Sequence, residues 1–316
     1  MNDQEVLDLF ASDEMARRSR LGVNGRLVHY TSAESAYKIL VSRTVWLRSA
    51  SLMNDFSEIS HGIDCIHGAW LSPAGARLQS LLNRLRDGLR DDFAKLFDGH
   101  ANGLRNDTYL MSLSEHDDTE DELGRLSMWR AYGGNAGVAL VLNVTAFAST
   151  TDAIKAYSAP VVYADRKAFI SWFEDWVERL LICEDRLKLA NPETVQNVLF
   201  YLFRNFAMCT KHPGFAEERE WRIFHSPLHE GTSPWLESSI EVLQGTPQQL
   251  IKLRLFDNDE AGVSGVAPRT LVERVIIGPC EHPLQIKAAI ADALVHADVE
   301  DVDNKVWMSL IPLRQS

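Results

Sequence analysis

Segments with strand and helix patterns follow one another along this 316-residue chain without regular alternation, and this order limits the folds open to it. Regular strand–helix alternation would indicate a parallel doubly wound sheet, which needs a crossover helix between strands. Here two long helix patterns, at 166–190 and 193–210, interrupt a chain that is otherwise rich in strand patterns. We therefore predict an α+β fold with a mixed or antiparallel central sheet and a helical insertion at about 166–210.

The length fits one large domain, and we expect a single domain over 1–316 with its core at 26–280 and an N-terminal helix at 4–19. Hydrophobic residues make up 46% of the chain, which is enough for a core without disulfides. Strand patterns cover 26–30, 45–48, 108–114, 138–142, 159–163, 220–225, 240–243, 250–256, 271–278 and 305–311. Further helix patterns cover 57–97, 127–132 and 284–295.

Charge and cysteine usage narrow the class of protein. The formal net charge of −12 argues against a protein that coats nucleic acid through bulk charge. The N-terminal residues lack a signal-peptide pattern, and no apolar run approaches the ~20 residues that span a bilayer. Four cysteines lie far apart without a CxxC pair, so we expect neither a zinc site nor a disulfide framework. These features predict a cytoplasmic protein with no membrane partner and no metal site.

The common enzyme motifs are missing from the sequence. It contains no GxGxxG after a strand, no GxxxxGK[ST], no HExxH and no GxSxG. The glycine-rich segment 133–137 (GGNAG) precedes a strand pattern rather than a helix. We interpret it as a plain turn before a core strand.

Three short segments combine a strand pattern with polar side chains that a core would not need. The first is 29–32 (HYTS), whose histidine could donate a hydrogen bond to a sugar hydroxyl, or which could simply cap a helix through Ser32. The second is 112–115 (SLSE), whose two serines share one face of a strand. Trp129 and Tyr132 follow it, either as ligand-stacking rings or as core aromatics.

The third segment is 217–222 (EEREWR). Glu218 and Glu220 project to the same side if the strand has begun there. A carboxylate fixed on a strand can stabilise a positive oxocarbenium centre and orient an attacking hydroxyl, as carboxylates do in glycosyl transfer. The alternative is a charged strand edge in which Arg219 and Arg222 neutralise the glutamates.

In this order the motifs resemble a bacterial family known as a domain of unknown function, number 2971. The segments that carry the resemblance, spread over about residues 26–280, are 27–32 (LVHYTS), 45–47 (VWL), 54–58 (NDFSE), 112–115 (SLSE), 128–132 (MWRAY) and 217–222 (EEREWR). The chain departs from the family pattern where Phe56 follows Asp55 without a proline between them, and where Met111 replaces a cysteine.

The layout is also similar to that of ADP-ribosyltransferases, and the opening HYTSAESAYKIL looks like that of DNA-modifying ADP-ribosyltransferase toxins and RNA 2′-phosphotransferases. The resemblance implies an ADP-ribosyltransferase-like sheet, NAD as substrate, and a toxin or phage-defence effector. It implies Glu220, with Glu218 as second candidate, as the catalytic carboxylate, and His29 as the residue that holds the nicotinamide-side ribose. The other residues that it implies for NAD binding are Tyr30, Thr31, Ser32, Arg48, Ser112, Ser114, Trp129, Tyr132 and Arg222.

Within this set the resemblance assigns roles by chemistry. Tyr132 or Trp129 would stack near the nicotinamide. Arg48 or Arg222 would pair with the pyrophosphate. The acceptor of ADP-ribose, a protein or a nucleic acid, is open, and the helices at 166–210 could recruit a regulatory partner protein.

Two alternatives come from other functional classes. The first is a metal-dependent nuclease, with ligands drawn from the acidic clusters, namely Glu58, Glu115, Asp117 and Glu220. The second is a non-enzymatic sensing or interaction module, in which the aromatic residues are core packing and the polar residues are incidental.

Overall fold

The computed structural model describes residues 1–22, 25–52, 56–148, 151–243 and 245–312. These residues divide into two compact units, and each unit is built from three separate stretches of chain. The helical unit consists of Met1–Arg20, Ser49–Thr108 and Ala159–Glu217, and the sheet unit consists of Leu21–Arg48, Tyr109–Ser158 and Glu218–Ser316. That the whole chain folds as a single domain stays a prediction.

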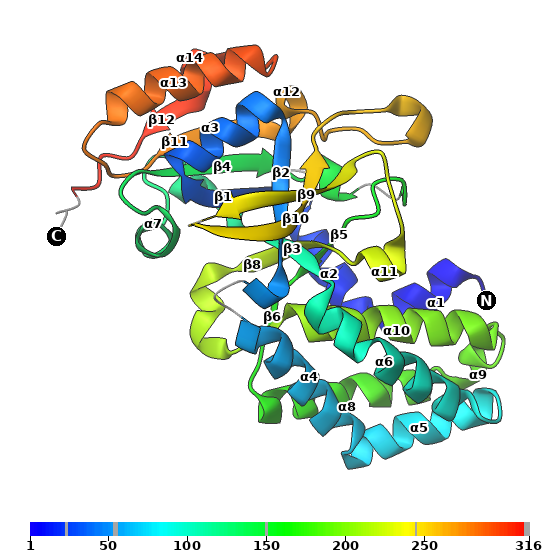
Figure 1. Ribbon diagram of the computed structural model, residues 1–316. Coiled ribbons are helices and arrows are strands. Elements are labelled where there is room, and N and C mark those ends of the chain that lie inside the picture. The colour runs from blue at the N-terminus through cyan, green and yellow to red at the C-terminus, as the bar shows by residue number, and fades with distance from the viewer. Residues whose placement is uncertain (23–24, 53–55, 149–150, 244, 313–316) are drawn as a thin grey trace. The chain divides into compact units, whose positions relative to one another are not determined.

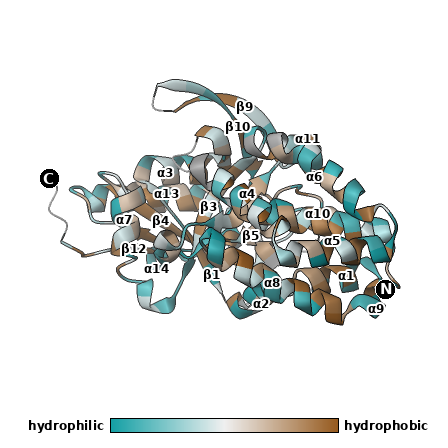
Figure 2. Ribbon diagram, turned by 90° about the horizontal axis from the view of Figure 1, so that it is seen from below, coloured by the Kyte–Doolittle hydropathy of each residue, from teal (hydrophilic) through white to brown (hydrophobic). Residues whose placement is uncertain are grey.

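Amphipathic helices make up the helical unit, and in Figure 2 its helices alternate between apolar and polar colour along their length. The α-helices are α1 (Asp3–Phe10), α2 (Ser12–Leu21), α4 (Phe56–Trp70), α5 (Pro73–Leu85), α6 (Leu89–Asn106), α8 (Arg166–Ile182), α9 (Glu184–Leu187) and α10 (Pro192–Cys209). Two short strands, β6 (Val162–Tyr163) and β7 (Thr210–Lys211), pair in parallel, and 3₁₀ turns cover Ala50–Leu52 and Pro213–Glu218. Helices α8 and α10 both pack on α4, so the predicted insertion belongs to a larger helical body.

Side-chain caps explain where these helices begin. Ser72, Asp165 and Asn191 each accept a hydrogen bond from a backbone N–H in the first turn of α5, α8 and α10. The single helix predicted at 4–19 is wrong, because the chain breaks at Ala11 into α1 and α2. The buried indole of Trp176 donates to the Phe10 carbonyl at 2.8 Å, which gives that carbonyl a partner at the break.

The sheet unit contains a mixed, mostly antiparallel sheet, which confirms the predicted α+β class (Figure 1). Its strands are β1 (Arg26–Ser32), β2 (Thr44–Ser49), β3 (Tyr109–His116), β4 (Gly137–Asn143), β5 (Tyr157–Pro160), β8 (Glu220–His225), β9 (Leu236–Leu243), β10 (Thr246–Arg254), β11 (Val272–Ile277) and β12 (Val306–Met308). The order is β12-β11-β4-β1-β3-β2-β10-β9, with β8 pairing with β3 and β5. Strands β11 and β12 run parallel, whereas the β1–β3, β1–β4 and β3–β8 pairs are antiparallel. The finer likeness to an ADP-ribosyltransferase sheet stays a prediction.

Helices cover both faces of the sheet around β1 and β4 (Figure 1). The helices of this unit are α3 (Ala33–Ser42), α7 (Leu126–Tyr132), α11 (Pro227–Glu230), α12 (Pro268–Leu271), α13 (Pro283–His296) and α14 (Val302–Lys305), with 3₁₀ turns at Asp118–Glu120, Thr145–Ala148 and Asp259–Ala261. Helices α3 and α13 bury Leu40 and Leu294 in a core with Leu27. Helix α7 packs Trp129 on the other face, against Val28 and other residues of β1, β4 and β11.

Strands β1 and β3 separate within the sheet, and this separation positions the candidate site. Their ladder ends at the pair Val28 and Ser114. Strand β1 then continues along β4 as far as Ser32, whereas β3 continues along β8 as far as Tyr109. His29 is therefore the first residue of β1 past the end of the β1–β3 ladder.

Across the described parts of the chain, no helix has the length and apolar character required to cross a membrane.

Candidate functional site

His29 lies at the point where β1 leaves β3, and its side chain bridges the two strands. Its Nδ1 is 3.1 Å from the backbone oxygen of Ser112. Because a carbonyl oxygen can only accept, Nδ1 carries the proton in this contact. Burial lowers the pKa of His29, although the Ser112 carbonyl acts in the opposite direction. In the neutral ring Nε2 is then unprotonated, so it accepts hydrogen bonds rather than donating them.

Ser112, Glu220 and Arg222 form a buried polar group on one face of the β3–β8 pair. Cross-strand partners share a face, and the register pairs Ser112 with Arg222 and Ser114 with Glu220. The Ser112 hydroxyl donates to Glu220 Oε1 at 2.5 Å, and Arg222 Nε donates to the same oxygen at 2.8 Å. Glu220 and Arg222 are each 3% exposed. The carboxylate is therefore fixed in direction and its charge is balanced locally.

Glu218 lies two residues before Glu220 and nearer the surface. Its Oε1 accepts a hydrogen bond from the hydroxyl of Tyr132 at 3.0 Å. Its backbone oxygen accepts one from the hydroxyl of Ser114. Tyr132 is 42% exposed. The predicted residues Ser114, Tyr132 and Glu218 therefore meet beside the buried group.

Trp129 is a core residue, 3% exposed, and it presents no free ring face to a ligand. Its ring meets that of Tyr30 edge-on with centroids 4.8 Å apart, and its Nε1 donates to the Leu123 carbonyl at 2.8 Å. Cβ atoms added at Gly137 and Gly278 would come within 3.0 and 2.7 Å of the Trp129 ring. Gly137 of the glycine-rich segment and Gly278 thus leave room for the indole. Of the two predicted stacking residues, only Tyr132 is exposed.

Tyr30, Thr31 and Ser32, the other residues of this segment predicted to bind NAD, make contacts with neighbouring parts of the fold. The Tyr30 hydroxyl accepts a hydrogen bond from the backbone N–H of Arg125 at 2.9 Å, and burial raises the pKa of Tyr30 to about 12. Thr31 is half-buried and pairs with Val138 of β4. Ser32 accepts from the backbone N–H of Ser35 at 3.2 Å, which confirms its predicted role as the cap of α3.

Arg48 differs from Arg222 in lacking a carboxylate partner among the described residues. It lies on β2 opposite Leu250, and its Nη2 is 3.5 Å from Gln248 Oε1. Its Nε is buried and has no hydrogen-bond partner in the described part of the chain. No hydrogen bond joins it to Ser112 among these residues. Of the two arginines predicted to pair with an anion, Arg222 has a carboxylate partner, whereas Arg48 has none among the described residues.

Sequence reasoning missed Arg125, which links the segments of the site. Its Nη1 donates to the Ser114 hydroxyl at 3.0 Å, its Nη2 donates to the Glu115 carbonyl at 2.7 Å, and its Nε donates to Glu120 at 3.1 Å. Its position as a lone arginine between an acidic loop and the MWxxY motif is the only signal that the sequence offers for it.

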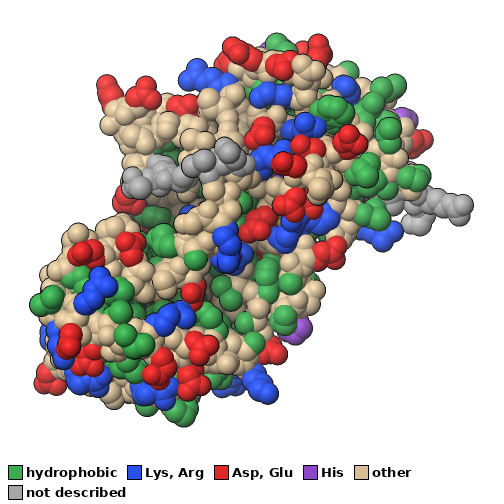
Figure 3. Space-filling model, turned by 180° about the vertical axis from the view of Figure 1, so that it is seen from behind, with side chains coloured by type: hydrophobic (Ala, Val, Ile, Leu, Met, Phe, Trp, Pro, Cys, Tyr) green, Lys and Arg blue, Asp and Glu red, His purple; other side chains and the backbone are tan. Residues whose placement is uncertain are grey.

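Arginines pair with acidic residues of the loop at 117–122. Arg26 pairs with Asp118 at 2.5 Å and with Asp121 at 2.7 Å, and Arg219 pairs with Asp117 and Glu120. Figure 3 likewise shows acidic and basic side chains interleaved over the face in view. These acidic residues thus make contacts between distant segments of the chain and also contribute to its net charge.

The ligands of the nuclease hypothesis do not gather into a metal-binding group. Among the residues that the structure describes, no group of three or more His, Cys, Asp or Glu side chains is placed to hold a metal ion. Three of the four proposed ligands have other partners: Glu115 accepts from Trp221 Nε1 at 2.9 Å, Asp117 pairs with Arg219 and Glu220 pairs with Arg222. The Glu58 side chain and residues 54–55 of the predicted family motif lie outside what the structure describes.

Comparison with known families supports part of the predicted resemblance. Residues 128–223 match the model of a family described as Protein of unknown function (DUF2971). The matched stretch begins at the MWRAY motif and ends just after EEREWR. No curated protein and no solved structure matches the chain. The motifs before residue 128 and the ADP-ribosyltransferase-like layout stay predictions.

Proposed function

We propose that the chain is an NAD-dependent ADP-ribosyltransferase with its catalytic centre where β1, β3 and β8 meet. One observation carries the proposal. His29, Ser112 and Glu220 come from three separate polar segments of the sequence, and hydrogen bonds of 3.1 and 2.5 Å join them through Ser112. An oriented carboxylate can stabilise the positive centre that forms in glycosyl transfer, and a histidine acceptor and a hydroxyl can hold the sugar.

In the proposed reaction the bond between ribose C1′ and the nicotinamide nitrogen breaks. The electron pair of that bond leaves with nicotinamide, and C1′ becomes an oxocarbenium centre. The acceptor nucleophile forms a bond to C1′ and loses its proton. Glu220 stabilises the positive centre, because its direction is held by Ser112 and Arg222 before substrate arrives.

The neighbouring residues supply binding contacts in this proposal. The unprotonated Nε2 of His29 accepts a hydrogen bond from a ribose hydroxyl. The exposed ring of Tyr132 stacks near the nicotinamide, with Glu218 holding its hydroxyl. Arg48, which has no carboxylate partner among the described residues, pairs with the pyrophosphate. A toxin or phage-defence role and a regulatory partner are further predictions from the resemblance.

Nicotinamide release tests the proposal directly. The full chain is incubated with NAD labelled on the adenine side, with and without cell extract, and both free nicotinamide and labelled acceptor are measured. Glu220→Gln should lower nicotinamide release by about 10²-fold or more, since an oriented charge is removed. A folded chain that neither releases nicotinamide nor labels any acceptor contradicts the proposal.

Two further variants make this experiment specific. Glu237→Gln changes another arginine-paired carboxylate on an exposed strand and should leave the rate unchanged. Glu218→Gln separates the two candidate carboxylates, and we expect a smaller loss than for Glu220→Gln. A larger loss for Glu218→Gln would transfer the catalytic role to Glu218. Thermal unfolding of each variant shows whether a lost rate reflects lost structure.

A further inference from the structure

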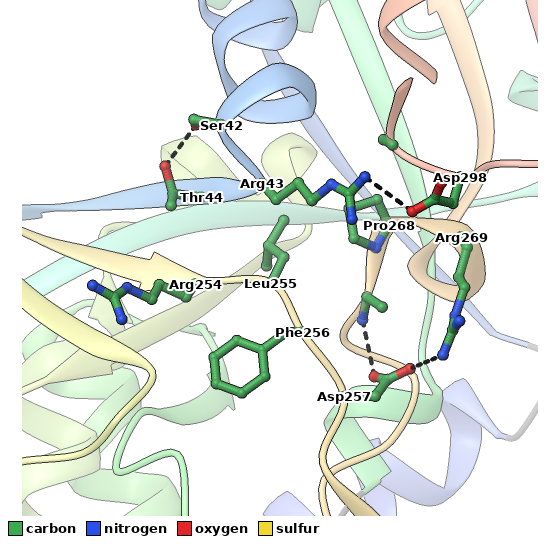
Figure 4. A pocket seen from close by; sticks show the side chains of 12 residues that line it. Ser42, Arg43, Thr44, Arg254, Leu255, Phe256, Asp257, Pro268, Arg269 and Asp298 are labelled. Atoms are coloured by element: carbon green, nitrogen blue, oxygen red, sulfur yellow. Dashed lines mark hydrogen bonds and ion pairs between the residues drawn. The ribbon is translucent and has the colours of Figure 1, made fainter. Parts of the chain in front are cut away.

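A separate pocket of about 420 Å³ lies in the sheet unit (Figure 4). It is formed by the end of α3 and start of β2, the chain after β10, helix α12 and the chain after α13. No residue of the proposed catalytic centre lines it. Pockets of ~300–1,000 Å³ are the usual size for small-molecule ligands. The pocket is therefore large enough for a small molecule and distinct from the proposed catalytic centre.

Positive charge prevails among the residues that line this pocket. Three arginines stand against two carboxylates, a formal excess of one positive charge in a chain whose net charge is −12. The five residues are Arg43, Arg254, Arg269, Asp257 and Asp298. Arginine presents a planar fork of donors that matches the oxygens of a phosphate. This lining favours an anionic ligand.

Two of these arginines can change partners at little cost. Arg43 pairs with Asp298 at 2.9 Å and donates to the His296 carbonyl at 2.6 Å, and the side chains of the ion pair are 44% and 66% exposed. Arg269 is 61% exposed and lies 3.8 Å from Asp257, beyond hydrogen-bonding distance. Exposed pairs of this kind contribute little to stability. Both arginine side chains are thus exposed enough for an incoming anion to reach them.

An aromatic ring completes the lining on the other side of the pocket. Phe256 stacks on Trp235 with ring centroids 4.8 Å apart and planes 8° apart. Trp235 is 2% exposed and its Nε1 donates to the Phe256 carbonyl at 2.9 Å, so the phenyl ring has a rigid support. Phe256 is one of the residues that line the pocket. Such a supported ring suits contact with a flat heterocycle.

We propose that this pocket binds a nucleoside phosphate. Arg43 and Arg269 hold the phosphate groups and Phe256 contacts the base. Figure 4 shows the Arg43 and Arg269 side chains on one side of the pocket and the Phe256 ring on the other. The proposal is independent of the proposed catalytic centre, because the two share no residue.

Calorimetric titration of the full chain with ADP, adenosine and inorganic phosphate tests the proposal. ADP should bind at least tenfold more tightly than adenosine or phosphate, since it alone makes both kinds of contact. Arg43→Gln combined with Arg269→Gln should weaken ADP binding at least tenfold. Phe256→Leu should weaken ADP binding and leave phosphate binding unchanged.

Matched variants separate binding in this pocket from binding elsewhere on the chain. Arg86→Gln removes an arginine that is 40% exposed and paired with Asp92 in the helical unit, and it should leave ADP affinity unchanged. Glu220→Gln should also retain ADP binding, even if it abolishes nicotinamide release. ADP binding that survives the double arginine variant in a chain that also carries Arg48→Gln, or that disappears in a Glu220→Gln variant shown to be folded, overturns the proposal. A parent chain that shows no saturable ADP binding overturns it as well.

Discussion

Two arginine–carboxylate pairs in the sheet unit have the same chemistry and opposite surroundings. Arg222 and Glu220 pair on β8 with side chains 3% and 5% exposed. Arg254, which lines the pocket of Figure 4, pairs with Glu237 at 2.5 Å with side chains 50% and 49% exposed. Water competes with the exposed pair but not with the buried one. The buried pair should therefore matter more for the stability of the fold than the exposed pair.

The largest effect should come from breaking the buried pair. Arg222→Met leaves the Glu220 carboxylate buried without its counter-charge, and we expect the free energy of unfolding to fall by about 3–5 kcal/mol in urea titrations. Arg254→Met is the matched exposed change. Adding Glu220→Leu to Arg222→Met should recover part of the loss, because no charge is then left buried. Equal losses for Arg222→Met and Arg254→Met would remove the contrast between the two pairs.

A smaller effect should follow from removing the hydroxyl that binds Glu220. Ser112→Ala deletes one hydrogen bond to a buried charged group, which should cost about 1.5–3 kcal/mol of unfolding free energy. Ser238→Ala, which removes an exposed hydroxyl on β9 bonded to Gln249, should stay within about 0.5 kcal/mol. If both serine variants have the same stability, the Ser112 hydroxyl does not hold the carboxylate.

Acid should lower the stability of the folded chain through His29 and His116. Burial lowers the pKa of His29 and of His116, so the unfolded chain binds protons at a higher pH than the folded one. The contribution of each histidine to the free energy of unfolding is therefore fully present above pH ~6.5. It falls as the pH decreases from there toward the lowered pKa, with a slope of about 1.4 kcal/mol per pH unit for each histidine. His29→Gln and His116→Gln should each flatten this slope.

The smallest effect is expected at the exposed pair itself. Arg254→Gln should change the free energy of unfolding by less than about 1 kcal/mol, and added salt should reduce even that difference. Unfolding at low and high ionic strength measures both. A loss above about 2 kcal/mol, well outside the range of exposed pairs, would show that exposure is a poor guide to the role of this pair.

Local patterns in the sequence predicted most elements of the fold. The strand at 220–225 has the predicted bounds, and Ser32 caps α3 as its position before Ala33 suggested. Alternation and capping act between residues close in sequence, so a sequence pattern can reveal them. The break at Ala11 was not predictable in this way, because the partner of the Phe10 carbonyl is an indole 166 residues away.

Some features of the candidate site likewise follow from sequence patterns, whereas others depend on the tertiary structure. The sequence by itself identified the candidate residues, since His29, Ser112 and Glu220 stand out as polar groups in strand patterns. Only the tertiary structure decided that they join through Ser112, that Trp129 is core, and that Arg222 has a carboxylate partner while Arg48 has none among the described residues. Strand order and burial depend on contacts between distant segments, which no local spacing encodes. The pocket of Figure 4 also depends on contacts between distant segments, because residues from four separate stretches of chain line it.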